Sequence, residues 1–439
     1  MPKNLPITTL ALITANAQTL RLFRTHLVAA LVARGVRVLA LAPNFDDDSR
    51  ALVRSLGAEP VDCRLQRTGL NPVRDVLDTL HLARLLRRLR PDVVLGYAAK
   101  PVIYGSMAAR LAGVPRRLAM VEGLGFAFTP SGEKMSVKRR LFQRLLMELY
   151  RAAFACAHRV VFLNPDDEAQ LVDAGLLPAS KAFMLGGIGL DLAQWQPAAP
   201  VSEPPTFLLT ARLLREKGVL EFANAARIVK SQHPQARFIL LGVPDEANPG
   251  SITAAQAQAW VDEGLLEWPG FQPVAPWLVQ ASVFVLPSYR EGVPLSTQEA
   301  MAMARPVITT DAPGCRETVL DGVNGFLVPP RNAQALAQKM CVFIEQPELI
   351  ASMGQASRRL AQERFDVHQV NERLIAIILF SYLNKAEKAK YKKEMVSLSY
   401  LLGYRNDRKS IATKILYNVL GLNLSSFLLS RLIKLRNIL

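Results

Sequence analysis

Two glutamates with seven residues between them mark the stretch of this chain in which a ligand site is easiest to predict. Residues 288–300 read SYREGVPLSTQEA and contain Glu291 and Glu299. The preceding run VFVL has the length and composition of a buried strand, and the AMAMA that follows Glu299 favours a helix. We therefore place both carboxylates at a strand-to-helix turn, where open α/β sheets bind their ligands.

The chemistry of this turn suits a nucleotide sugar. A helix that begins near Ser296 directs unpaired N–H groups and the positive end of its dipole toward an anion such as a diphosphate. Gly292 allows that ligand to approach the backbone. Carboxylates repel a diphosphate but accept hydrogen bonds from the hydroxyls of a sugar and a ribose. Two simpler interpretations stay open: Ser296 and Glu299 form a capping box, and Glu291 is a solvated loop residue.

Residues 283–330, VFVLPSYREGVPLSTQEAMAMARPVITTDAPGCRETVLDGVNGFLVPP, resemble the signature of retaining glycosyltransferases of family 4, which have the GT-B fold. The resemblance extends upstream to ARLLREKGVLEF and LLGVPDEANPGS. In that family the two glutamates contact the donor sugar and the ribose, and an Arg and a Lys five residues apart hold the diphosphate. The resemblance therefore implies that Glu291 orients the sugar, that Glu299 binds the ribose, and that Arg212 and Lys217 bind the diphosphate.

The resemblance also implies how the reaction is catalysed. The sugar leaves a dianionic group, so fixed positive charge from Arg212, Lys217 and the helix start after Pro294 is expected to stabilise the transition state. The alternative interpretation of Arg212 and Lys217 is a pair of ordinary surface charges that follow a strand. No metal-ligand set is visible, so we expect no metal and no other cofactor beside the UDP-sugar substrate. The implied donor site also includes Gly292, Val293, Pro294, Leu295, Ser296 and, in an earlier glycine-rich loop, Gly189.

Composition limits the class of protein. The chain has 439 residues, half of them apolar, which is enough for two domains. Its four cysteines are scattered singly, which argues against a metal site or disulfide scaffold and favours a reducing compartment. The N-terminal apolar stretch superficially fits a signal peptide, but we interpret it as a first strand. No uncharged run reaches the roughly 18 residues of a membrane span, so we expect a cytoplasmic protein.

The alternation of strands and helices predicts two doubly wound domains. The resemblance to family 4 implies that they face a cleft in the GT-B arrangement and that a helix crosses back to the first domain. We place an N-terminal Rossmann-like acceptor domain at 1–198, a Rossmann-like donor domain at 199–365 after the proline-rich linker 197–205, and a crossover helix at 366–384. A basic amphipathic, helical extension occupies 385–439. The expected strands are 10–14, 36–42, 93–96, 117–121 and 159–163 in the first half, and 206–210, 238–242, 283–286 and 306–309 in the second.

Three loops at the carboxyl ends of the first-half strands are candidates for the acceptor side, and two of them resemble a subgroup that builds bacterial surface glycans. In EGLGFAF, Gly123 permits close approach of a ligand, and Glu122 is our candidate for an acceptor-hydroxyl contact. Phe126 and Phe128 either stack on a sugar or prenyl chain or belong to the core. The other two loops offer Asn16 and Lys100; the alternative for Lys100 is a surface lysine.

Two segments could contact an anionic membrane. Residues 134–150 have a basic amphipathic pattern, which also fits an ordinary helix packed on the sheet. Residues 385–439 hold twelve basic and three acidic residues, so +9 of the net charge of +16 lies there. The alternatives for this tail are a docked appendage, an oligomer contact or a poorly ordered extension. The remaining charge needs no nucleic-acid partner, and no nucleic-acid-binding motif is present.

These inferences together predict a retaining glycosyltransferase that moves a hexose or N-acetylhexosamine from a UDP-sugar to a hydroxyl. The expected acceptor is a polyprenyl-diphosphate-linked or other glycan in the biosynthesis of a surface polysaccharide, such as lipopolysaccharide or capsule. The expected location is the inner face of the cytoplasmic membrane, as a peripheral protein. Two alternatives are a UDP-sugar 2-epimerase of the same fold and a non-catalytic subunit that binds sugar nucleotides.

Overall fold

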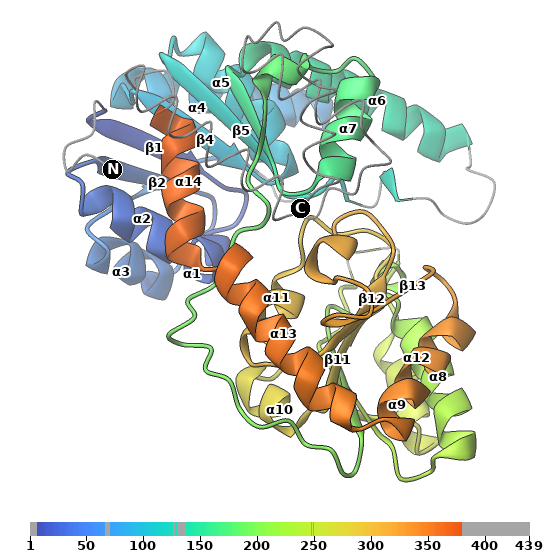
Figure 1. The fold of residues 1–439 in the computed structure, drawn as a ribbon. Coiled ribbons are helices and arrows are strands. Elements are labelled where there is room, and N and C mark those ends of the chain that lie inside the picture. The colour runs from blue at the N-terminus through green and yellow to red at the C-terminus, as the bar shows by residue number, and fades with distance from the viewer. Residues whose placement is uncertain are drawn as a thin grey trace, which may run out of the picture.

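The computed structural model describes residues 7–65, 71–125, 128–129, 137–246, 248 and 250–379. The predicted tail, the last residues of the crossover segment and Phe126 lie outside these residues. Two parallel sheets, each covered by helices, form the two halves of the molecule (Figure 1). The chain therefore has the two-sheet architecture that the alternating pattern predicts.

The first sheet is built from residues 9–184 in the order β3-β2-β1-β4-β5-β6-β7, with every neighbouring pair parallel. Alternate residues of its inner strand β1 enter different clusters, Leu10 and Leu12 on one face and Ala11 and Ile13 on the other, because both faces are covered. Its strands are β1 Thr9–Ile13, β2 Arg37–Ala42, β3 Glu59–Asp62, β4 Val93–Tyr97, β5 Arg116–Val121, β6 Arg159–Phe162 and β7 Ala182–Met184. Its helices are α1 Gln18–Phe23, α2 Thr25–Val32, α3 Asp47–Ser55, α4 Pro72–Leu89, α5 Ser106–Leu111, α6 Val137–Cys156 and α7 Pro165–Asp173.

The second sheet has the order β10-β9-β8-β11-β12-β13 and is also parallel. Its strands are β8 Thr206–Thr210, β9 Arg237–Leu241, β10 Glu267–Gly270, β11 Val283–Leu286, β12 Val307–Thr310 and β13 Gly325–Val328. The helices of this half, and the two that follow it, are α8 Val219–Gln232, α9 Ala254–Asp262, α10 Ala275–Gln280, α11 Leu295–Ala302, α12 Ala333–Glu345, α13 Glu348–Arg364 and α14 Val367–Leu379.

Every strand expected from the sequence is present within about one residue at each end. The strands that the pattern missed are β3, β7, β10 and β13, and these four form the outer edges of the two sheets. They span three or four residues each, and β3 and β10 contain a proline. A short edge strand tolerates proline and polar residues, so its sequence carries little periodic signal.

The linker between the sheets is held by a buried arginine. Residues 197–205 contain no helix or strand, as their prolines predict. The fully buried side chain of Arg305 donates hydrogen bonds to the carbonyl oxygens of Ala198 (2.7 Å), Ala199 (3.4 Å) and Leu278 (2.7 Å). Because these carbonyls surround the guanidinium, the linker is fixed on the second half.

After α13 the chain returns to the first half. The backbone N–H of Leu190 donates to Phe365 O (2.9 Å), and the N–H of Val367 donates to Leu190 O (3.0 Å). From that junction α14 runs back and packs against α2 (Figure 1). The described part of the predicted crossover segment, 366–379, therefore connects the second half back to the first.

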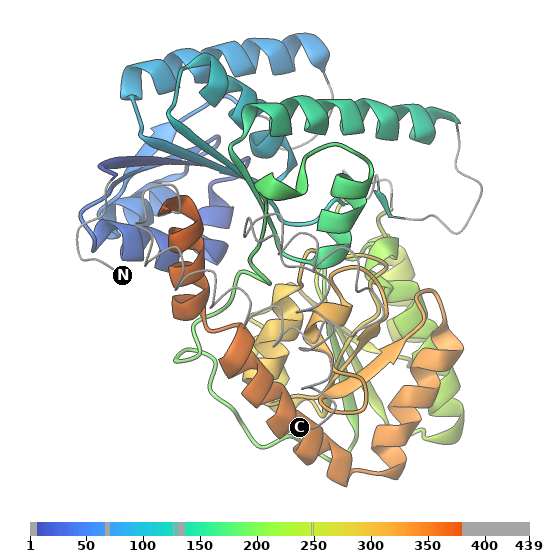
Figure 2. The same ribbon diagram turned by 45° about the horizontal axis from the view of Figure 1, so that its top comes forward.

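Helix α6 is only partly packed on the sheet. Tyr150 and Phe154, in its C-terminal half, are buried in the core of the first half. Its N-terminal half extends past the body of the molecule (Figure 2) and exposes Leu141, Phe142 and Leu145. The interpretation of 134–150 as an ordinary helix packed on the sheet therefore fits only its C-terminal end. No helix in the described part of the chain has the length and apolarity needed to cross a bilayer.

Candidate functional site

The predicted donor residues meet at the carboxyl ends of two neighbouring parallel strands, β8 and β11. Lys217 follows β8 in a short 3-10 turn, and Glu291 follows β11. The turn lies against the end of β11, since a Cβ on Gly218 would come within 2.2 Å of Pro287 O. Gly218 also has a φ of 73°, a conformation that glycine adopts without strain. This close approach brings the ammonium of Lys217 to 2.5 Å from a carboxylate oxygen of Glu291.

Arg212, the second predicted diphosphate cation, stands at the rim of the same strand ends. Its guanidinium is about half exposed and lies 2.5 Å from the carboxylate of Asp245, which follows β9. Lys217 and Arg212 each pair with a carboxylate, so their side chains are held near the strand ends without a ligand. A diphosphate carries two negative charges and can replace or share these partners.

Helix α11 begins at Leu295, with Pro294 as its N-cap residue. Ser296 is therefore the second residue of the helix and Glu299 the fifth, and the N-cap makes no side-chain hydrogen bond. The capping-box interpretation of these two residues is wrong. With no side chain closing the helix start, the first N–H groups remain available to an anion.

Glu299 and Val293 occupy different environments on this turn. Burial raises the pKa of Glu299 from its ordinary value of 4.5 to about 8. Val293 is buried and lies beside Gly187, where an added Cβ would come within 3.5 Å of its side chain. Val293 therefore packs the turn onto the domain junction.

The structure brings one predicted acceptor loop directly against the donor turn. A Cβ on Gly292 would lie 2.1 Å from Glu122 O, and one on Gly123 would lie 3.1 Å from the nitrogen of Gly292. The loop after β5 therefore touches the loop that carries Glu291. Only glycine at Gly292 allows the two backbones to approach this closely.

Glu122 forms an ion pair that the sequence did not reveal. The buried guanidinium of Arg24, between α1 and α2, donates a hydrogen bond to its carboxylate and also lies over the ring of Tyr97 at 4.6 Å. Burial raises the pKa of Glu122, and the charge of Arg24 opposes that rise. The pair fixes the Glu122 side chain at the carboxyl end of β5, and an acceptor contact of Glu122 stays a prediction.

Asn16 and Lys100 have different surroundings. Asn16 is half-buried in the loop after β1, and its carbonyl oxygen accepts a hydrogen bond from Thr19 (2.7 Å). Lys100 is buried, and its ammonium lies 2.7 Å from Asp75, which also accepts a hydrogen bond from Tyr104 (3.0 Å). The surface-lysine interpretation of Lys100 is wrong, and its charge is already balanced inside the first half.

Two further predictions can be compared with the structure. Phe128 is buried in the core with its ring 6.3 Å from that of Tyr150, so it belongs to the core and does not offer a stacking face. Gly189 has a φ of 72°, and a Cβ there would meet Phe365 O and the Cα of Val367 at 2.9 Å. Gly189 is therefore needed where the crossover segment passes, and a contact with the donor stays a prediction.

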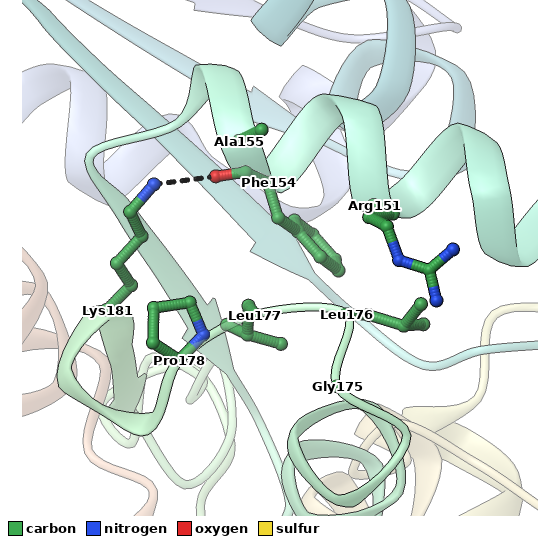
Figure 3. Close-up of a pocket in the computed structure, with 8 residues that line it drawn as sticks. All are labelled: Arg151, Phe154, Ala155, Gly175, Leu176, Leu177, Pro178 and Lys181. Carbon is green, nitrogen blue, oxygen red and sulfur yellow. Dashed lines mark hydrogen bonds between the residues drawn. The ribbon is translucent and has the colours of Figure 1, made fainter.

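A pocket of about 330 Å³ lies away from the strand ends, between the C-terminal part of α6 and residues 175–181 (Figure 3). Lys181 at its edge donates hydrogen bonds to Phe154 O (2.9 Å) and Ala157 O (2.8 Å). This lysine therefore caps the carboxyl end of α6. The pocket contains none of the predicted site residues.

In the part of the chain that the structure describes, no group of three or more His, Cys, Asp or Glu side chains is arranged to bind a metal ion. The chain does contain one Asp-x-Asp spacing, at 46–48, but Asp46 is the N-cap of α3 and accepts from Ser49 N (2.8 Å). Asp46 therefore has a structural role in this spacing, as the cap of α3. That the reaction needs no metal stays a prediction.

Two family models match the chain, one on each half. The model described as "Glycosyl transferase 4-like domain" matches residues 21–186, and the model described as "Glycosyl transferases group 1" matches residues 204–346. The chain is an enzyme of the glycosyltransferase type. The second match contains the whole turn from Glu291 to Glu299, and the first contains the loop with Glu122.

Known proteins of similar sequence are also named as glycosyltransferases. The N,N'-diacetylbacillosaminyl-diphospho-undecaprenol alpha-1,3-N-acetylgalactosaminyltransferase of Campylobacter jejuni is 29% identical over 368 residues, which cover 81% of this chain and 92% of that protein. The UDP-Gal:alpha-D-GlcNAc-diphosphoundecaprenol alpha-1,3-galactosyltransferase of Escherichia coli is 27% identical, with 66% and 73% covered. These names favour a transferase over the epimerase.

Solved structures share the fold. Sucrose-phosphate synthase from Thermosynechococcus elongatus superposes with a TM-score of 0.69 at 19% identity, covering 86% of this chain and 100% of that chain. HepE of Anabaena, solved in complex with UDP, gives 0.66 at 18% identity with the same coverage. The predicted GT-B fold is confirmed.

Proposed function

We propose that this glycosyltransferase moves a hexose or N-acetylhexosamine from a UDP-sugar to a hydroxyl of a lipid-linked glycan, with retention of the anomeric configuration. The product would be an intermediate of a surface polysaccharide. The relatives named above support a diphosphoundecaprenol-linked acceptor, and the UDP in the name of one relative and in the HepE complex supports the donor. Retention is inferred from the resemblance of the donor turn to family 4.

One observation carries the proposal: the Lys217–Glu291 pair stands at the ends of β8 and β11, and the loop with Glu122 and Gly123 faces it from the other half. A cation, a carboxylate and an uncapped helix start converge there on one side. The backbone of the loop that carries Glu122 approaches from the opposite side. This is the arrangement needed to bind a sugar diphosphate and to bring a second substrate to the sugar.

In the proposed donor site, Lys217 and Arg212 exchange or share their carboxylate partners when the diphosphate of the UDP-sugar binds. When a diphosphate binds, Lys217 and Arg212 form charge-assisted hydrogen bonds to its oxygens, and the first N–H groups of α11 also donate to it. Glu291, released in part from Lys217, then accepts hydrogen bonds from the sugar hydroxyls. As the bond to the sugar breaks, the same cations stabilise the charge that develops on the departing UDP. No residue of this site needs a metal to perform these steps.

The acceptor lipid is proposed to place the enzyme at the inner face of the cytoplasmic membrane. On α6, Val137, Leu141 and Leu145 are spaced four residues apart and are exposed, so they form one apolar stripe. Arg140 and Arg144 are exposed beside it. Apolar side chains that enter the interface and arginines that meet anionic headgroups together bind a peripheral protein.

The function is tested by incubating the enzyme with a panel of UDP-hexoses and UDP-N-acetylhexosamines and a polyprenyl-diphosphate-linked sugar. We expect one donor to give an extended lipid-linked product whose new bond, by NMR, has the anomeric configuration of the donor. An inverted product would refute retention. A donor changed at its second carbon without an acceptor would instead identify an epimerase, and UDP binding without any turnover would identify a non-catalytic subunit.

A further inference from the structure

The loop that carries Glu291 is held from both halves of the molecule. On the donor side, Glu291 N donates to Pro313 O (2.9 Å). On the acceptor side, the amide of Asn164 donates to Gly292 O (2.7 Å), and the guanidinium of Arg290 bonds to Asp167 and to Gln170 Oε1 (2.7 Å). The residues on either side of Glu291 are therefore attached to the first half.

These attachments are buried and connected to one another. Asn164 and Asp167 are fully buried, and only 5% of the Arg290 side chain is exposed. Asn164 caps α7 by accepting from Asp167 N (2.8 Å), and its amide also donates to Asp167 Oδ2 (3.0 Å). The Asp167 carboxylate lies in the first turn of α7, where the helix dipole favours a negative charge.

A second ion pair crosses the same boundary. Asp166, the neighbour of Asp167 in the first turn of α7, bonds to Arg316 of the second half. Arg316 is held in place by Asp311 Oδ1 at 2.6 Å. The start of α7 therefore receives one arginine from the loop after β11 and another from the segment after β12.

We propose that Asn164, Asp167 and Arg290 form an interdomain latch that docks the Glu291 loop onto the start of α7 and so sets the distance between the donor sugar and the acceptor face. This inference rests on the proposed function. The three are positioning residues, because they act through Glu291. Arg212 and Lys217 make none of the latch bonds, and Lys217 pairs with Glu291 within the second half. Opening the latch is therefore expected to change turnover more than UDP binding.

The test uses one mild variant, one charge-neutral pair and one matched control. Asn164→Ser keeps a side-chain oxygen that can cap α7 but removes the amide that reaches Gly292 O. Asp167→Asn combined with Arg290→Gln removes both buried charges together, so neither is left unpaired. The control is Asn71→Ser, which makes the same substitution at the N-cap of α4.

We expect both latch variants to lower kcat by about 100-fold, the loss that a misplacement of about 1 Å can produce. The Kd for UDP, measured by calorimetry, should stay within about threefold of wild type, in keeping with a site outside the latch. The radius of gyration from small-angle X-ray scattering should increase in the paired variant, and Asn71→Ser should match wild type in all three measurements.

An unchanged kcat in the latch variants, or a loss of UDP affinity as large as the loss of kcat, would overturn the latch. If the wild-type enzyme transfers no sugar, the proposed function fails, and the scattering measurement still decides about the latch. In that case an unchanged radius of gyration in the paired variant overturns it, and an increased radius supports it.

Discussion

Replacing Glu299 by glutamine is expected to change how stability depends on pH. Burial raises the pKa of this carboxyl from 4.5 to about 8. Between these values the folded protein holds a proton that the unfolded chain has lost, so the free energy of unfolding falls as the pH rises. The contribution of the protonated Glu299 carboxyl to the free energy of unfolding is fully present below pH 4.5 and is lost by about pH 8. Glutamine keeps the shape of the side chain but does not ionise.

The size of the effect follows from the width of this interval. Each pH unit corresponds to about 1.4 kcal/mol, so the full interval corresponds to on the order of 5 kcal/mol. The side chain is half-buried, so this is an upper value. Glu168 and Glu317, whose pKa values burial raises to about 7, give slopes of the same sign that remain in the variant.

The assay is thermal unfolding of wild type, Glu299→Gln and the exposed control Glu363→Gln between pH 5 and pH 9. At pH 5 all three should unfold at similar temperatures. At pH 9 the Glu299 variant should unfold up to about 10 °C above wild type, since 1 kcal/mol shifts Tm by about 2 to 4 °C in a domain of this size. A wild type and Glu299 variant that lose stability in parallel over this range would refute a raised pKa at Glu299.

The remaining predictions concern the donor site and the membrane. Lys217→Ala should weaken UDP binding by about 1 to 3 kcal/mol, measured by calorimetry, and Arg212→Ala by about 1 kcal/mol because that side chain is more exposed. Equal affinity in wild type and both variants would contradict the diphosphate role. Glu291→Gln should keep the circular dichroism spectrum of wild type but lose about 100-fold in kcat, the scale of one lost transition-state contact; a rate near that of wild type would show that the cleft is wrongly assigned. Activity should survive EDTA, and a loss that manganese restores would contradict metal-free transfer. Changing Leu141 and Leu145 together to glutamine should reduce co-sedimentation with anionic liposomes at low salt, and unchanged sedimentation would exclude α6 as the membrane contact.

The pattern of the sequence determined most of the fold because buried parallel strands are local signals. The runs at β8 and β11 were predicted with their observed bounds, Thr206–Thr210 and Val283–Leu286. Once both lie in one parallel sheet, their carboxyl ends must share an edge. The meeting of Lys217 and Glu291 therefore follows from two local patterns and one rule of topology. The edge strands gave no such signal, since three or four residues are too few to show a period and β3 and β10 also contain a proline.

Only the tertiary structure decided which charged side chains meet when they are distant in the chain. The N-P-D-D sequence at 164–167 indicates a helix start, but Arg290 lies 123 residues from Asp167, and no periodicity links them. The same holds for Arg24 and Glu122, which are 98 residues apart. Such pairs depend on the relative orientation of elements that are distant in the chain. Local patterns report which face of an element is apolar, whereas the partner of a buried charge is set by packing.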